Sequence, residues 1–132
     1  MHSWLTSLSA RYVGTVASME PVSDHWPDLK AGERVTLSKA VKQRRDEFST
    51  GRYLCRRLMS VMGVGDDHRI PVGANRAPVW PPGIVGSISH TKNLCIAMLA
   101  PSGLYDGVGV DLEETNRVSE EIWTYVATDP GP

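Results

Sequence analysis

Two short motifs decide the fold that we expect for this chain: Ser87-Ile88-Ser89-His90-Thr91 and, further along, Gly109-Val110-Asp111-Leu112-Glu113. The first motif reads as a strand that ends in a polar turn, a common place for side chains that contact a ligand. In the second motif apolar residues alternate with acids. The apolar positions should therefore face the core, while Asp111 and Glu113 share the opposite face of a strand.

Asp111 and Glu113 form a candidate metal site. Residues two apart on a strand have Cα atoms about 6.5–7 Å apart, so both carboxylates can reach one cation. Mg²⁺ prefers oxygen ligands and is commonly held by one or two carboxylates together with water and substrate phosphates. Magnesium-dependent phosphate chemistry is therefore the first hypothesis.

The residues around these motifs predict an α+β fold. Ile84–Ser89 and Leu94–Ala100 read as two strands of a hairpin, and the second strand is apolar on both faces, so it should be central and covered. Leu37–Met62 has apolar residues at helical spacing. Gly51 interrupts that pattern, which leaves one helix and two helices equally open.

The two ends of the chain are less regular. Residues 1–16 read equally well as a strand or as an irregular lead-in. Near the other end, Ser119 is a suitable N-cap and acids follow it directly, so Glu120–Ala127 reads as a helix.

Basic side chains concentrate on the predicted helix. Eight of the fourteen Lys and Arg residues lie between Arg34 and Arg57, whereas the chain from Tyr105 onward holds seven acids and one base. This segregation fits an anionic ligand on one side and a metal on the other, or two solvated helix faces. The same choice holds for the arginines that border the apolar stripe: they either point at phosphates or bury their stems and keep their heads in water. These arginines are Arg45, Arg52 and Arg56.

The two motifs, together with residues 73–86 and the arginine-rich helix, resemble the 4′-phosphopantetheinyl transferase superfamily, and in particular its enterobactin synthase component D branch. The resemblance runs from Leu37 to Thr128 and rests on several short motifs in the expected order. It implies an α+β fold of two pseudo-symmetric halves, with the first half in residues 1–104 and the start of the second in residues 105–132. Nothing after Glu121 resembles the family's third motif, so we expect a truncated member.

The resemblance also implies a function. Members are Mg²⁺-dependent transferases that move the phosphopantetheine group of coenzyme A to a serine of an apo acyl, peptidyl or aryl carrier protein. This branch serves siderophore and nonribosomal peptide synthesis, as for enterobactin. The alternative is a non-catalytic remnant that binds coenzyme A or a partner protein, because the missing third motif carries the general base.

Site roles follow from the same resemblance. Mg²⁺ would be bound by Asp111 and Glu113, which together with His90 make up the expected catalytic set. The contacts with coenzyme A would come from Arg52, Arg56, Arg76, Ser89 and His90.

Other classes of function fit the sequence poorly. The basic stretch holds only Phe48 and Tyr53 as aromatics, so it lacks the stacking platform of a nucleic-acid binder. Residues 1–17 have neither an early Lys or Arg nor an uninterrupted apolar run, which argues against a signal peptide. No stretch approaches the roughly 20 apolar residues of a membrane span. Cys55 and Cys95 have neither CxxC spacing nor the number expected of a disulfide framework, so we expect buried, reduced thiols. Without a predicted signal peptide or membrane span, the cytoplasm is the expected location.

Overall fold

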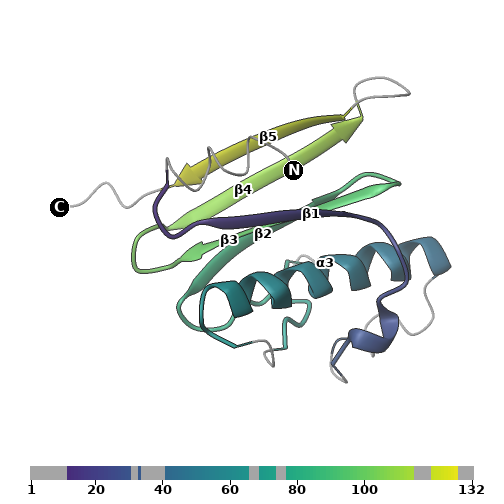
Figure 1. The fold of residues 1–132 in the computed structure, drawn as a ribbon, viewed down its shortest axis with the longest axis horizontal. Coiled ribbons are helices and arrows are strands. Elements are labelled where there is room, and N and C mark those ends of the chain that lie inside the picture. The colour runs from purple at the N-terminus through teal and green to yellow at the C-terminus, as the bar shows by residue number, and fades with distance from the viewer. Residues whose placement is uncertain are drawn as a thin grey trace.

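The computed structural model describes residues 12–30, 33, 41–65, 69–73, 77–114 and 120–127. Figure 1 shows a long helix, a three-stranded sheet and a separate β-hairpin, stacked in that order. The predicted α+β class is confirmed. The elements are β1 (Val16–Pro21), the 3₁₀ helix η1 (Trp26–Asp28), α3 (Lys42–Val61), β2 (Ile84–His90), β3 (Leu94–Pro101), β4 (Gly107–Glu114) and β5 (Glu120–Ala127).

The three-stranded sheet has the order β1-β3-β2, and both of its strand pairs are antiparallel. β2 and β3 form the predicted hairpin, with Ile84 opposite Pro101 and His90 opposite Cys95. β1 begins at Val16, so among residues 12–16 only the last belongs to a strand. The rest of the undecided stretch, residues 1–11, lies outside the described part.

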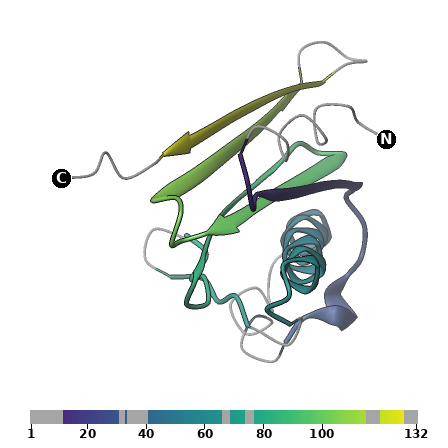
Figure 2. The ribbon, with the colours of Figure 1, turned by 60° about the vertical axis from the view of Figure 1, so that its left-hand side comes forward.

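β3 divides the core into two parts, because its side chains point alternately to the two faces of the sheet. One face packs against α3 and the other packs against β4; Figure 2 shows the helix and the β4–β5 hairpin on opposite sides of the sheet. The predicted central, covered position of β3 is therefore confirmed. Toward α3 lie Cys95, Ala97 and Leu99, with Leu54, Cys55, Leu58 and Met59 of the helix. Toward β4 lie Ile96, Met98 and Ala100, with Val108, Val110 and Leu112.

α3 is one continuous helix, which settles the question that Gly51 left open. It begins at Lys42, later than predicted, and residues 34–40 lie outside the described part. A Cβ atom placed on Gly51 would lie 3.0 Å from Cγ2 of Ile88 in β2. Gly51 therefore allows the helix and the sheet to approach closely, and this packing offsets the roughly 1 kcal/mol that glycine costs inside a helix.

The segment Glu120–Ala127 is a strand, so the helix prediction was wrong. β5 pairs antiparallel with β4 over its whole length, from Gly107 opposite Ala127 to Glu114 opposite Glu120. Its sequence is rich in β-branched and aromatic residues, which favour strands. Pairing also uses an edge of β4 whose backbone groups would otherwise lack partners. Together these outweigh the local helix-start signal.

We expect Gly51→Ala to destabilise the protein by about 1 kcal/mol, because overpacking against Ile88 exceeds the gain in helix propensity. In an Ile88→Ala background, which removes Cγ2, the same substitution should instead stabilise by up to about 1 kcal/mol. Chemical unfolding of the four proteins in this double-mutant cycle measures both effects. An equal effect of Gly51→Ala in the two backgrounds would contradict the close-packing role.

The two cysteines are free thiols inside the core, as expected, and burial raises the pKa of both Cys55 and Cys95 to about 12. Neither thiol should react with a disulfide reagent at pH 8 in the folded protein, whereas both should react in strong denaturant. Their folded pKa lies above the ordinary value of 9.0, so the stability they contribute is complete below pH 9 and is lost as the pH rises toward 12. Rapid labelling of the folded protein would contradict this burial.

Candidate functional site

A pocket of about 200 Å³ opens where the first half of α3 meets the end of β2. Two predicted ligand residues, Arg52 and His90, meet there although they are far apart in the sequence. The pocket is lined by Arg44, Glu47, Phe48, Gly51 and Arg52 of the helix, Ile88 and His90 of β2, and Pro78 from the segment before β2.

Arg52 is the best-positioned cation of this pocket. Only 6% of the residue is exposed, its Nε atom donates a 2.8 Å hydrogen bond to the carbonyl of Ile70, and its guanidinium lies 4.3 Å from the ring centre of Phe48. Within the described part of the chain, its terminal nitrogens have no hydrogen-bond partner. Burial lowers the pKa of Arg52, but an arginine titrates so far above neutrality that it keeps its charge. The pocket therefore offers a rigid cation to an anion.

The other two arginines of the predicted row have different surroundings. Arg45 lies 4.2 Å above the ring of Trp26, and it is not part of the pocket lining. Arg56 is 7% exposed, and its Nη1 atom donates hydrogen bonds of 2.9 and 2.8 Å to the two carboxylate oxygens of Glu33. The Nη1 atom of Arg56 is thus engaged in a buried ion pair with Glu33. The predicted contact between Arg56 and a ligand stays a prediction.

Glu33 links several segments through its carboxylate. Besides Arg56, it accepts hydrogen bonds of 2.8 Å from the backbone N–H groups of Lys30 and Ile70. Since Ile70 also accepts the bond from Arg52, the ion pair supports the wall on which Arg52 rests. The ion pair between Arg56 and Glu33 therefore has a structural role.

Ser89 and His90 lie on opposite faces of β2, as neighbours on a strand must. His90 faces α3, where its Nδ1 atom is 3.6 Å from Oε2 of Glu47. Ser89 faces β4: its hydroxyl accepts a 3.0 Å hydrogen bond from the N–H of Leu112 and lies 3.4 Å from Oδ1 of Asp111. The predicted site residues therefore form two groups, one on each side of the end of β2.

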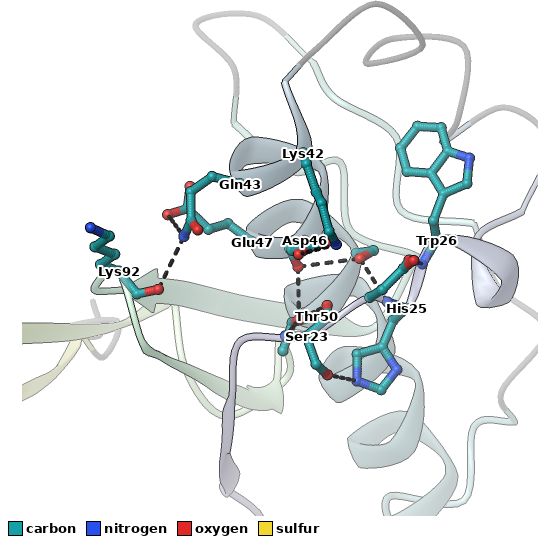
Figure 3. A network of polar contacts seen from close by, with 11 residues as sticks. Ser23, His25, Trp26, Lys42, Gln43, Asp46, Glu47, Thr50 and Lys92 are labelled. Atoms are coloured by element: carbon teal, nitrogen blue, oxygen red, sulfur yellow. Dashed lines mark hydrogen bonds and ion pairs between the residues drawn. The ribbon is translucent and has the colours of Figure 1, made fainter.

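Glu47 is held in place by a polar network around the first turns of α3, shown in Figure 3. Nε2 of Gln43 donates to Oε2 of Glu47 at 2.9 Å and to the carbonyl of Lys92 at 3.0 Å. Lys92 belongs to the turn between β2 and β3, so the network ties that turn to the helix beside His90.

Asp111 and Glu113 are both exposed on β4, while Val110 and Leu112, which alternate with them along the strand, are buried, and this confirms the predicted alternation. Among the described residues, no group of three or more acids, histidines or cysteines gathers into a metal site. Two carboxylates on one strand face fit Mg²⁺, which commonly takes its other ligands from water and phosphates. Arg76, a predicted ligand residue, lies outside the described residues.

The comparison with known proteins identifies the family. Residues 32–100 match the sequence family described as the 4′-phosphopantetheinyl transferase N-terminal domain. The chain belongs to that family. The matched region includes all of α3, β2 and the Arg52 pocket, which confirms the resemblance that the motifs suggested.

Curated relatives agree with this assignment. The chain is 30% identical over 105 residues to 4′-phosphopantetheinyl transferase Npt of Nocardia iowensis, a match that covers 78% of this chain and 47% of the relative. It is 32% identical over 81 residues to PptT of Mycobacterium tuberculosis, covering 61% and 35%. It is 33% identical over 79 residues to enterobactin synthase component D of Salmonella typhi, covering 59% and 31%. The chain thus spans under half the length of these relatives.

The sequence analysis did not assign a site role to Arg44 or Glu47. Arg44 lies four residues before Phe48 and eight before Arg52, so all three share one helix face. That spacing was a usable signal for Arg44. Glu47 lies at the site because it approaches His90 of β2. The spacing of residues along the helix does not reveal a contact with another element.

Among the described residues no helix is long and apolar enough to cross a membrane.

We expect Arg56→Met to lower the free energy of unfolding by about 3–5 kcal/mol, because it leaves the carboxylate of Glu33 buried without its cation. The matched control is Arg57→Met on the same helix: Arg57 is exposed and lies 3.5 Å from Glu20, so its loss should cost less than about 1 kcal/mol. Urea unfolding measures both variants. Equal stabilities of the two would contradict a structural role for the buried pair.

Proposed function

We propose that this chain is the coenzyme A-binding part of a 4′-phosphopantetheinyl transferase. The enzyme would transfer the phosphopantetheine group of coenzyme A to a serine of an apo carrier protein. The observation that carries the proposal is the buried cation Arg52, which faces a pocket beside His90 at the same end of β2 as Asp111. Membership of the family supports the type of reaction.

The pocket on the helix side suits a phosphate group. Arginine binds phosphate through paired, charge-assisted hydrogen bonds, and Arg52 is already held in place for such a contact. Arg44 and His90 add donors from two elements. A volume of about 200 Å³ is smaller than the roughly 300–1,000 Å³ of sites for whole drug-sized ligands, so the pocket matches one phosphate and its surroundings.

The carboxylates on the β4 side suit the cation. Mg²⁺ held by Asp111 and Glu113 would neutralise charge on the pyrophosphate of coenzyme A. The hydroxyl of Ser89 lies beside Asp111 and can orient its carboxylate. Coenzyme A would then be held on both sides of the end of β2, with Arg56 and Arg76 as further proposed contacts.

The reaction is a phosphoryl-type transfer. The serine hydroxyl of the carrier protein attacks the β-phosphate: its proton passes to the general base that the family's third motif carries, and its oxygen forms the new bond to phosphorus. The bond to the bridging oxygen breaks, and 3′,5′-adenosine bisphosphate leaves. The proposed catalytic residues of this chain are those that would contact the phosphates or the cation: His90, Asp111 and Glu113.

We further propose that residues 1–104 form the first of two pseudo-symmetric halves and that residues 105–132 begin the second. The change from the sheet β1-β3-β2 to the hairpin β4–β5 supports this boundary. A siderophore-type carrier protein is the proposed partner, supported by the similarity to enterobactin synthase component D. A cytoplasmic location stays a prediction.

The first experiment follows the mass of an apo peptidyl carrier protein after incubation with this chain, coenzyme A and Mg²⁺. Transfer predicts a gain of one phosphopantetheine group that is lost with Asp111→Ala. Binding of coenzyme A without any gain in mass would support the second candidate, a non-catalytic binding protein.

Titration calorimetry with coenzyme A tests the pocket separately. Arg52→Met should weaken binding by roughly ten- to a hundredfold, as expected for a lost charge-assisted hydrogen bond. Arg44→Gln tests the same pocket at an exposed position, and Arg57→Met serves as the control outside it. Unchanged affinity in both pocket variants, with their folding verified by circular dichroism, would refute the site.

A further inference from the structure

Two serine hydroxyls join the face of the three-stranded sheet to the edge of β4. Ser87 accepts a 3.1 Å hydrogen bond from the N–H of Val110, and Ser89 accepts one of 3.0 Å from the N–H of Leu112. The two serines are two residues apart on β2, and the two N–H groups are two residues apart on β4. We call this pair of side-chain-to-backbone hydrogen bonds, Ser87–Val110 and Ser89–Leu112, the serine ladder. Alternate residues of an antiparallel strand direct their N–H groups to the same side, so both bonds lie along one edge of β4.

The ladder matters because the two N–H groups sit among buried residues. Val110 is 6% exposed and Leu112 is 4% exposed. A buried N–H group without a partner is unfavourable, so each hydroxyl replaces the carbonyl that a further strand would otherwise supply. The ladder therefore fixes how far β4 is shifted along β2, which apolar packing alone specifies only loosely.

Asp111 lies between the two bonded N–H groups. Its backbone is held on both sides, by Ser87 through Val110 and by Ser89 through Leu112. Ser89 also approaches the carboxylate itself. Among the described residues, the side chain of Ser87 makes one hydrogen bond, the one from Val110, so we expect Ser87 to act through the position of β4.

We propose that Ser87 is a positioning residue: its hydroxyl sets the register of β4 on β2 and so places the Asp111 carboxylate for a divalent cation. This inference rests on the proposal that Asp111 and Glu113 hold that cation. In this proposal Ser87 acts through β4 and does not contact the cation or coenzyme A itself.

The test compares three substitutions at Ser87 in the full chain. Ser87→Ala removes the acceptor, Ser87→Cys keeps the volume with a weaker acceptor, and Ser87→Thr keeps the hydroxyl. Mn²⁺ alone is the probe, titrated while the amide signals of β4 are followed by NMR. We expect the dissociation constant for Mn²⁺ to rise about tenfold in Ser87→Ala, as for loss of an outer partner of a metal ligand, and to return near the original value in Ser87→Thr.

Hydrogen exchange of the Val110 amide gives an independent readout, and it should be faster in Ser87→Ala than in the unmodified chain. Thr50→Val is the matched control, since it removes a hydroxyl that bonds the backbone of Ser23 on the other side of α3. It should lower stability without changing Mn²⁺ affinity. If Ser87→Ala does not fold, Ser87→Cys gives the same comparison.

The outcomes separate the two proposals. Faster exchange at Val110 with unchanged Mn²⁺ affinity would overturn the positioning role and leave the metal site intact. A chain that does not bind Mn²⁺ before any substitution would refute the metal site, and the positioning role would fall with it. Equal losses of Mn²⁺ affinity in Ser87→Ala and Thr50→Val would reduce the effect to general destabilisation and overturn the inference.

Discussion

The burial of β3 on both faces is the constraint on which the rest of the structure depends. Every residue from Cys95 to Ala100 is fully buried, so the strand needs apolar cover on both sides. α3 covers one face and β4 covers the other. Because both elements are placed against the same strand, the arginines of the helix and the carboxylates of β4 reach defined positions on either side of the sheet. β3 thus organises a site to which it contributes no predicted ligand.

The arginines of α3 show how one type of side chain takes different roles on one helix. Arg56 is neutralised by Glu33, and Arg45 is stacked on Trp26. Arg52 is also buried, but it lines the pocket and is not paired with Glu33. A buried charge is unfavourable unless a counter-charge reaches it, so an anion gains most by binding at Arg52. A coenzyme A contact at Arg52 stays a prediction, and the lining of the pocket is compatible with it.

Ser87 and Ser89 of β2 accept hydrogen bonds from backbone N–H groups of β4. β4 pairs with β5 and is not a strand of the three-stranded sheet, and two of its N–H groups bond to side chains of β2 instead. Short hydroxyl groups at Ser87 and Ser89 can reach those N–H groups, whereas an apolar residue at either position would leave a buried donor without a partner. The same bonds hold β4, which carries Asp111, against the face of β2 opposite to that of His90.

Much of the fold could be predicted from local patterns. The alternation around Asp111 and Glu113 and the apolar run of Leu94–Ala100 predicted the correct strands and buried faces, because side-chain direction along a strand follows from its backbone geometry. The same reasoning failed for Glu120–Ala127. That segment forms a strand because it pairs with β4. A helix-start signal in the local sequence carries no information about such a pairing.

The candidate site was predictable only in part. Motif order pointed to Arg52, His90 and Asp111, but several arginines shared one pattern on the helix. Only the tertiary structure shows that Glu33, 23 residues away, pairs with Arg56 and that Arg52 faces the pocket. The sequence by itself determined which residues could carry charge and which face of each element they occupy. The partners of those charges were decided by the packing of elements distant in the chain, since burial and counter-charges arise only when those elements meet.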